Sequence, residues 1–351
     1  MEKIAPALLD WFYRNRRSLP FRDDPTPYHI WVSEIMLQQT RVAAALPYYE
    51  RFIRELPDIP ALAACPPERL DKLWEGLGYY RRVHSMQKAA QQVCRQYGGH
   101  LPASYDALLA LPGIGPYTAG AIASIGFGLA APAVDGNVLR VFARLYNDSG
   151  PITDPAVKKR FTQRVMEHQP PDAPGDYNQA LMELGALVCL PGGAPLCAQC
   201  PLAALCEGRK AGAAEALPCK AAPKPRRVLP VTVALVQNAA TGEWLLQKRP
   251  EGGLLAGLWQ PPAFEGRQLD GPAVRQALSA LGLDPGSGGP APLPAAKHIF
   301  THVEWRMSGW KLTVPDQPAP GGCVWAGRDG LEGRYALPGA FKAYRKFLLE
   351  A

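Results

Sequence analysis

The spacing of apolar residues changes once along the chain, near residue 207. Before that point apolar positions recur three and four residues apart, interrupted by short turns rich in proline and glycine, which is typical of amphipathic helices. Beyond it, residues 228–236 and 243–248 are apolar runs that meet around Thr241-Gly242, which predicts two antiparallel strands joined by a turn. The pattern predicts a multidomain protein in which an all-α domain precedes an α+β domain.

The stretch between the two patterns sets the expected domain limits. It is rich in alanine, lysine, glycine and proline and offers little to bury, which is typical of a linker. We therefore predict one domain at 1–207 and another at 228–351, separated by a linker at 208–227. Within the second domain, the Pro/Gly-rich residues 284–294 predict an exposed loop.

Composition indicates an intracellular protein with a polyanionic partner. No apolar run approaches the ~20 residues needed to cross a bilayer, and the first four residues lack the pattern of a secretory signal. We therefore expect an intracellular location, in the cytoplasm or nucleoid. The formal net charge of +7 suits a nucleic acid, although a solvated basic face is an equally good reading of charge alone.

Four of the eight cysteines are crowded together at Cys189, Cys197, Cys200 and Cys206. In a reducing compartment, the spacing C-x7-C-x2-C-x5-C favours thiolates around one metal centre over disulfides. Such a set suits either zinc or a four-iron four-sulfur cluster, and the spacing alone does not separate the two.

A glycine-containing turn, LPGIG at residues 111–115, lies between two predicted helices. Gly113 and Gly115 allow the backbone to turn tightly and to present its N–H groups to an anion, with a helix amino terminus behind them. The stretch therefore fits a phosphate-binding hairpin, although a glycine turn between helices is often only a turn.

These motifs together resemble the helix-hairpin-helix DNA glycosylase superfamily. The hairpin is followed by YTAGA at 117–121, then by VDGNV at 134–138, and the cysteine loop comes after both. Within the superfamily, WVSEIMLQQT at 31–40 and GLGYYRR at 76–82 resemble the MutY-type adenine glycosylases. The resemblance covers nearly the whole chain. It implies a base excision repair enzyme that hydrolyses the N-glycosidic bond of adenine mispaired with 8-oxoguanine or guanine in duplex DNA, leaving an abasic site without nicking the strand.

Two carboxylates are the candidates for the chemistry. Adenine leaves readily only when a ring nitrogen is protonated, so a carboxyl group that is still protonated near neutral pH is required. Glu34 lies among apolar neighbours, which raise a carboxyl pKa, and we assign it as the general acid. Asp135 matches the superfamily's catalytic aspartate, and we assign it as the stabiliser or nucleophile at the sugar. Without the motifs, an exposed helical glutamate and a helix-capping aspartate would be the ordinary readings.

The resemblance adds further residues. Tyr117 and Asn137 are expected to support the sugar by hydrogen bonds, although either could be an ordinary surface polar group. Because the target base must leave the stack, side chains are also needed to fill the gap and to line the adenine pocket. The implied DNA contacts in the first domain are Arg22, Leu37, Gln38, Gln39, Tyr79, Gly113 and Gly115.

The resemblance also favours an iron-sulfur cluster over zinc at the cysteine loop. It implies that the loop 189–206 holds one four-iron four-sulfur cluster, with Cys189, Cys197, Cys200 and Cys206 as ligands. The family's usual first gap is six residues, whereas seven separate Cys189 from Cys197 here. We expect the Pro/Gly-rich loop to absorb the extra residue as a bulge, which leaves Cys189 the ligand most affected.

The second domain resembles the family's Nudix-like domain, through GLLAGLWQPP at 253–262. No glutamate-rich helix for magnesium is present, so we expect this domain to bind and not to hydrolyse. Phe300, Thr301 and His302 resemble the family's Phe-Ser-His loop that contacts 8-oxoguanine, with threonine replacing serine. Threonine keeps the hydroxyl, and a strand-edge polar pair is the alternative reading.

Three other functions share some of these motifs. A thymine-glycol or oxidised-pyrimidine glycosylase with strand-nicking activity needs a Schiff-base lysine where Tyr117 stands. A non-catalytic lesion reader requires neither Glu34 nor Asp135. A Nudix pyrophosphatase lacks its magnesium helix. We expect the chain to act as a monomer on duplex DNA, and no residue pattern points to a protein partner.

Overall fold

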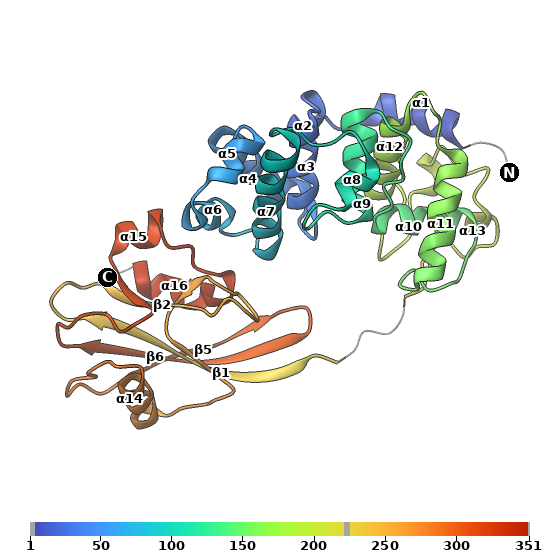
Figure 1. Cartoon of the computed structure of the whole chain (residues 1–351). Helices are drawn as coiled ribbons and strands as arrows, with labels where there is room; N and C mark the ends of the chain where they lie inside the picture. The colour runs from blue at the N-terminus through green and yellow to red at the C-terminus, as the bar shows by residue number, and fades with distance from the viewer. Residues whose placement is uncertain (1–3, 221–224, 350–351) are drawn as a thin grey trace. The chain divides into compact units, whose positions relative to one another are not determined.

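A computed structural model describes residues 4–220 and 225–349, and the chain divides into two compact units (Figure 1). The division in the carboxyl-terminal half falls at residues 222–223, inside the predicted linker, of which residues 221–224 lie outside the described residues. The units comprise Met1–Ala64 with Arg81–Ala222, and Cys65–Tyr80 with Pro223–Ala351.

The described part of the first unit is helical, as the apolar spacing predicts. Its helices are α1 (Ala5–Asn15), α2 (Pro20–Asp23), α3 (Pro27–Leu37), α4 (Val42–Glu55), α5 (Ile59–Ala64), α7 (Arg81–Tyr97), α8 (Tyr105–Leu109), α9 (Pro116–Ala121), the π-helix η1 (Ile122–Gly126), α10 (Gly136–Leu145), α11 (Pro155–His168), α12 (Pro174–Leu187), the 3₁₀-helix η2 (Cys197–Gln199) and α13 (Glu207–Lys210). Among the residues that the structure describes, no helix is long and apolar enough to cross a membrane.

Large aromatic side chains hold α1, α10, α11 and α12 together. Phe12, Phe142, Phe161 and Tyr177 each come from a different one of these helices and are fully buried in one cluster. Each such side chain removes a large apolar area from water and contributes roughly 2–3 kcal/mol to stability. The core therefore fixes α10 and α12, two of the helices that carry functional side chains described below.

A close backbone approach brings α9 beside the segment that leads into α10. A Cβ atom at Gly120 would lie 1.8 Å from the carbonyl oxygen of Pro132, so only glycine fits there. Tyr117 lies on the first turn of α9, and Asp135 follows Pro132 by three residues. The glycine in the YTAGA motif thus allows these two residues to approach one another.

The second unit contains a mixed seven-stranded sheet, in which five strands follow the order β3-β2-β1-β6-β5, β4 pairs with β1, and β7 pairs with β2. Strands β1 and β6 are parallel. The antiparallel pairing of β1 with β2 confirms the predicted turn at Thr241-Gly242. Its elements are α6 (Pro67–Trp74), β1 (Arg227–Asn238), β2 (Trp244–Lys248), β3 (Trp259–Gln260), β4 (Ala263–Glu265), α14 (Gly271–Ala280), β5 (Ala291–Ile299), β6 (Val303–Val314), β7 (Cys323–Ala326), α15 (Arg328–Gly333), the 3₁₀-helix η3 (Gly339–Phe341) and α16 (Lys342–Leu349).

Alternating side chains of β1 supply both faces of this sheet. Val233 and Leu235 pack with residues of α15, η3 and α16, whereas Ala234 and Val236 pack with α14. Figure 1 shows α14 on one face of the sheet and α16 on the other. The second unit is therefore an α+β layer structure, as the sequence predicts.

The prediction of a loop over residues 284–294 is wrong at its carboxyl-terminal end. Strand β5 begins at Ala291 and contains Pro292 and Pro294. Because β5 lies at the edge of the sheet and shifts register between Leu293 and Ala296, the missing N–H groups of these prolines are tolerated.

Candidate active site

Glu34 lies in the middle of α3 and is 8% exposed. Pro27 and Thr26 set the start of this helix, since Thr26 Oγ1 accepts a hydrogen bond from the His29 N–H at 3.2 Å. Burial raises the pKa of Glu34 to about 7; the Asp135 charge adds to the rise, and a hydrogen bond from Tyr117 opposes it. A large fraction of Glu34 is therefore protonated at neutral pH, as the apolar neighbours predict.

Tyr117 connects the hairpin to this acid. Its hydroxyl donates a hydrogen bond to Glu34 Oε2 and lies 3.4 Å from Met182 Sδ on α12. Burial, and then the nearby Glu34 and Asp135 charges, raise the pKa of Tyr117, so the phenol stays protonated and remains a donor. Tyr117 is thus hydrogen-bonded to the candidate acid, at the position where a strand-nicking enzyme needs a lysine.

Asp135 is the amino-terminal cap of α10. Its Oδ1 accepts a hydrogen bond from the Val138 N–H at 2.8 Å, and its Oδ2 accepts one from Asn137 Nδ2 at 2.7 Å. Burial raises the pKa of Asp135, whereas these hydrogen bonds and the Arg140 charge lower it. The capping role and a role at the sugar are compatible, because the cap fixes the carboxylate in one orientation beside Glu34.

Arg140 supports Asn137 from behind and is a residue that the sequence analysis missed. Its Nη2 donates to Asn137 Oδ1 at 2.9 Å and to the Gly185 carbonyl at 2.8 Å, while its Nε donates to the Cys189 carbonyl at 2.8 Å. The side chain is buried with these partners. One signal was available: Arg140 follows Gly136 by four residues and so lies on the same helix face as the VDGN motif.

Glu183 on α12 is a second residue that the sequence analysis missed. Its Oε1 accepts from Arg17 Nε at 2.7 Å, and its Oε2 accepts from Arg17 Nη2 at 2.7 Å and from Arg22 Nη2 at 2.9 Å. Burial by itself would raise the pKa of Glu183, but these hydrogen bonds lower it to about 2. The charge of Arg22 also lowers the pKa of Glu34, so the predicted pocket residue Arg22 pairs with an ionised carboxylate and acts electrostatically on the candidate acid.

The predicted residues 37–39 follow the catalytic helix. Leu37 is the last residue of α3, and the backbone carbonyl of Gln38 accepts a hydrogen bond from Arg82 Nη1 at 2.6 Å. Gln39 is exposed and has a φ of 60°, an uncommon left-handed conformation for a residue other than glycine. Arg82 therefore holds the turn that presents Gln39.

The predicted hairpin is present between α8 and α9. Gly113 has a φ of 77°, and a Cβ atom there would lie 2.6 Å from Ser85 Cβ on α7, so glycine is required on both grounds. Gly115 is the exposed amino-terminal cap of α9, ahead of Pro116 at the first helical position.

All four clustered cysteines line one small hollow of about 30 Å³ between α10 and the loop that follows α12. Arg144 also lines it, and its Nη1 donates to Cys189 Sγ at 3.2 Å and to the Leu190 carbonyl at 2.8 Å. Burial raises the pKa of Cys200 to about 11, and it also raises that of Cys206. Within the described ranges, no three or more His, Cys, Asp or Glu side chains are placed to hold a single metal ion.

The remaining predicted residues belong to the second unit. Phe300, Thr301 and His302 form the short connection between β5 and β6, in which Thr301 and His302 are exposed. The Phe300 ring lies edge-on to those of His298 and Trp305, with centroids 4.5 and 4.9 Å away. Tyr79, which falls within the predicted first domain, also belongs to this unit, whereas Glu34 and Asp135 belong to the first.

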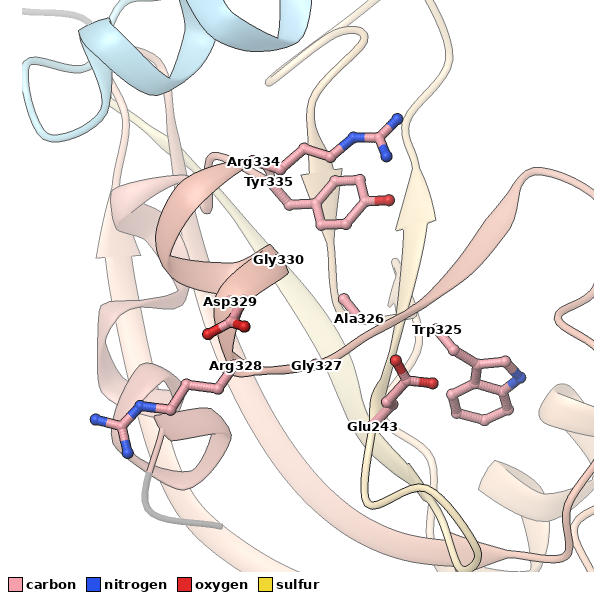
Figure 2. A pocket seen from close by; sticks show the side chains of 9 residues that line it. All are labelled: Glu243, Trp325, Ala326, Gly327, Arg328, Asp329, Gly330, Arg334 and Tyr335. Carbon is pink, nitrogen blue, oxygen red and sulfur yellow. The ribbon is translucent and has the colours of Figure 1, made fainter.

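A separate hollow of about 410 Å³ lies in the second unit beside α15. Figure 2 shows Glu243 and Trp325 on one side of it, Arg328 and Asp329 on the other, and Tyr335 between them. None of the predicted site residues lines it. Pocket size alone does not identify the reactive site in this chain.

Comparisons with known proteins agree with the fold and with the residues brought together in the first unit. Residues 32–167 match the model of the HhH-GPD superfamily of base excision DNA repair proteins, and residues 232–346 match that of the NUDIX domain. A thermostable thymine-DNA glycosylase of known structure is 26% identical, with a TM-score of 0.53, over 59% of this chain and 94% of its own. The class defined by fold and site is therefore a helix-hairpin-helix DNA glycosylase.

Two relatives extend the match into the second unit. The adenine DNA glycosylase of Homo sapiens is 34% identical over 384 aligned residues, which cover 91% of this chain and 69% of the human protein. That of Mus musculus is 35% identical, over 91% of this chain and 72% of the mouse protein. The chain belongs to the adenine DNA glycosylase family.

Proposed function

We propose that this chain hydrolyses the N-glycosidic bond of adenine mispaired with 8-oxoguanine or guanine in duplex DNA, leaving an abasic site. The observation that carries the proposal is the buried Glu34, whose pKa of about 7 lies in the range required of a general acid, beside a second carboxylate, Asp135. The names of the relatives give the base, adenine, and the kind of reaction.

In the first step Glu34 gives its proton to a ring nitrogen of the extruded adenine. The bond between the base and C1′ of the deoxyribose then breaks, and its electron pair leaves with the base. Tyr117 holds Glu34 Oε2 by a hydrogen bond, which leaves Oε1 to face the base. After proton transfer the Glu34 carboxylate accepts a proton from the water that attacks C1′.

Positive charge develops on the sugar as the base leaves. Asp135 stabilises that charge, or captures the sugar transiently, from a position fixed by Val138 N–H and Asn137 Nδ2. A preoriented carboxylate does not have to reorganise during the reaction, which is the main source of such stabilisation. Arg140 maintains Asn137 in this arrangement.

The adenine pocket is formed around Arg22, with Leu37 and Gln38 at the end of α3. The ionised Glu183 accepts hydrogen bonds from Arg17 and Arg22 and so holds Arg22 in place.

We assign the remaining predicted residues to the DNA. The hairpin with Gly113 and Gly115 binds a backbone phosphate, and Gln39 and Tyr79 fill the space left by the extruded base. In the second unit, Thr301 and His302 are exposed on the connection after β5 and contact the 8-oxoguanine, with Phe300 beside them.

The cysteine loop is proposed to hold one four-iron four-sulfur cluster. Four thiol groups around one hollow, with Arg144 donating to Cys189 Sγ, fit the donor set and the charge of such a cluster. When bound, the cluster supplies a covalent cross-link between α12 and the segment that leads to α13. Cys189, Cys197, Cys200 and Cys206 would be its ligands.

The substrate also bears on the oligomeric state and the location of the protein. We propose a monomer that acts on chromosomal DNA in the cytoplasm or nucleoid, because a duplex with one lesion presents no symmetry that a dimer could match. Sedimentation of the free protein and of its complex with one lesion duplex measures the number of chains bound.

Single-turnover excision on three matched duplexes tests the function. They carry adenine opposite 8-oxoguanine, adenine opposite guanine, and thymine glycol opposite adenine. We expect adenine release without strand nicking, fastest opposite 8-oxoguanine. Nicking of the thymine-glycol strand would support the oxidised-pyrimidine glycosylase instead, and duplex binding without release of any base would support the non-catalytic reader.

A further inference from the structure

The segment Cys65–Tyr80 belongs to the second unit although helices of the first unit flank it in the sequence. It consists of α6 and the turn Gly76–Tyr79 that follows it. The connection that contains Phe300 belongs to the same unit. The side chain proposed to enter the duplex, Tyr79, and the residues proposed to contact 8-oxoguanine therefore lie in one compact body.

Glu75 attaches the turn at residues 76–79 to the rest of the second unit. It caps the carboxyl end of α6 and immediately precedes Gly76. Its Oε1 accepts hydrogen bonds from the Leu337 N–H at 3.1 Å and from Arg345 Nη1 at 3.0 Å, and its Oε2 lies 2.6 Å from Lys72 Nζ. With its side chain only 11% exposed, the carboxylate is held in one position by three charge-assisted contacts.

Two further contacts join α6 to α15. Lys72 Nζ donates to the Leu331 carbonyl at 2.9 Å, and Arg334 Nε donates to Glu68 Oε2 at 3.2 Å. Arg334 leaves the end of α15 and extends away from the helix in Figure 2. Because Arg334 and Glu68 are exposed, their pair contributes little, and Glu75 with Lys72 forms the main attachment.

The turn itself is tied to the end of α6. Trp74 is fully buried, and its Nε1 donates to the Gly78 carbonyl at 2.9 Å, while the Leu77 N–H donates to the Trp74 carbonyl at 3.1 Å. Tyr79 has a φ of 49° and is 50% exposed. A left-handed conformation costs a residue with a side chain roughly 1–2 kcal/mol, so the attachments on α6 must maintain it.

We propose that Glu75 is a positioning residue through which the second unit controls Tyr79. The inference rests on the proposed function, since it takes Phe300–His302 to contact 8-oxoguanine. Binding energy gained at that connection is then available to hold Tyr79 in the duplex, because both are parts of one body and Glu75 fixes the turn to it. Guanine opposite adenine offers less of this energy, so the contact through Glu75 favours excision opposite 8-oxoguanine.

The test compares rates on two duplexes. Single-turnover excision is measured with adenine opposite 8-oxoguanine and opposite guanine, using the full chain and the variants Glu75→Ala, Glu75→Gln and Arg345→Ala. Fluorescence of 2-aminopurine beside the lesion reports unstacking by Tyr79. Arg328→Ala is the matched control, because Arg328 is an exposed residue of α15 that pairs with Glu332 of the same helix.

We expect Glu75→Ala to lower the ratio of the two rates about tenfold, with a smaller 2-aminopurine signal on the 8-oxoguanine duplex. Glu75→Gln keeps an acceptor for the Leu337 N–H and should lose less, as should Arg345→Ala. The control should keep the wild-type ratio. If Glu75→Ala does not fold, the rate ratios of Glu75→Gln and Arg345→Ala test the inference.

An unchanged ratio in all three variants overturns the inference. An equal fall of both rates also overturns it, because that outcome indicates a structural role alone. Absence of adenine release by the unaltered chain contradicts the proposed function, whereas adenine release with an unchanged ratio in the variants contradicts this inference alone, so the two failures are distinguishable.

Discussion

Arg140 donates a hydrogen bond to Asn137 at 2.9 Å, and the same guanidinium donates to the backbone carbonyl of Cys189 at 2.8 Å. Asn137 in turn donates to Asp135. One buried side chain thus links the first cysteine of the loop to the carboxylate proposed to act at the sugar. The integrity of the cysteine loop and the geometry of the sugar site are therefore coupled in this chain.

Replacing Arg140 tests that coupling. Arg140→Leu removes the donors to Asn137, Gly185 and Cys189, and leaves buried acceptors unsatisfied at a cost of ~1–3 kcal/mol each. We expect a lower unfolding temperature and at least about a hundredfold slower excision, because Asn137 is no longer held against Asp135. Differential scanning fluorimetry and single-turnover kinetics measure the two effects. Stability loss with an unaltered rate would contradict the coupling.

Excision should depend on pH through Glu34. Its pKa of about 7 means that the acid is protonated below neutral pH and ionised above it, so the rate of the chemical step should fall as pH rises through 7. Glu34→Gln should abolish excision and leave duplex binding nearly intact. Single-turnover rates between pH 5.5 and 9 and fluorescence anisotropy check both, and equal loss of binding and excision argues against the assignment.

The same substitution should stabilise the protein at high pH. Because the pKa of Glu34 in the folded chain exceeds that of the unfolded chain, the folded state binds more protons, and stability falls as pH rises from about 4.5 to 7. Ionising the buried group costs up to ~3 kcal/mol. Glu34→Gln should therefore unfold at a higher temperature than the unaltered chain at pH 8, with little difference at pH 4.5. An equal difference at both values of pH counts against burial as the cause.

Glu183 should show the opposite dependence. Hydrogen bonds from Arg17 and Arg22 hold its pKa near 2, so its contribution to stability is present above about pH 4.5 and is lost as pH falls toward 2. Glu183→Gln should destabilise the protein by roughly 3 kcal/mol at pH 7 and by much less at pH 3. Urea unfolding at both values of pH measures this. Glu332→Gln, in an exposed pair, is the control and should change little.

Iron content tests the cysteine loop. Purified under anaerobic conditions, the chain should contain about four iron and four sulfide per molecule. Cys200→Ser should lose most of the iron and lower the unfolding temperature, because a cross-link is removed. Cys94→Ser is the control, because Cys94 belongs to the same unit but is far from the loop in sequence. This variant should keep the iron and the unfolding temperature of the unaltered chain. Retention of one zinc and no iron in the unaltered chain would assign the loop to zinc instead.

Much of the fold followed from local patterns. The change from three- and four-residue spacing to strand-like runs separates the helical unit from the mixed sheet, because each element must bury one face. The limits of an element were predicted wrongly where those patterns are weak. Residues 291–294 form part of an edge strand despite Pro292 and Pro294, since an edge position tolerates missing N–H groups. The assignment of residues 65–80 to the second unit has no local signal at all.

The candidate site shows the same division. Glu34, Tyr117 and Asp135 were found because each stands in a short motif of neighbouring residues. Glu183 and Arg140 were not found, because their contacts join residues distant in sequence. Glu183 on α12 forms an ion pair with Arg22 on α2, and Arg140 on α10 donates a hydrogen bond to the cysteine loop.

The sequence by itself determined the change from a helical part to an α+β part, the hairpin, the cysteine spacing and the two carboxylates, since all of these are local in the chain. Only the tertiary structure decided the environment of each group. Burial and the nearby Asp135 charge raise the pKa of Glu34, and two arginines lower that of Glu183. The two glutamates are chemically identical, and the charges and solvent that surround each one after folding make one an acid and the other a permanent anion.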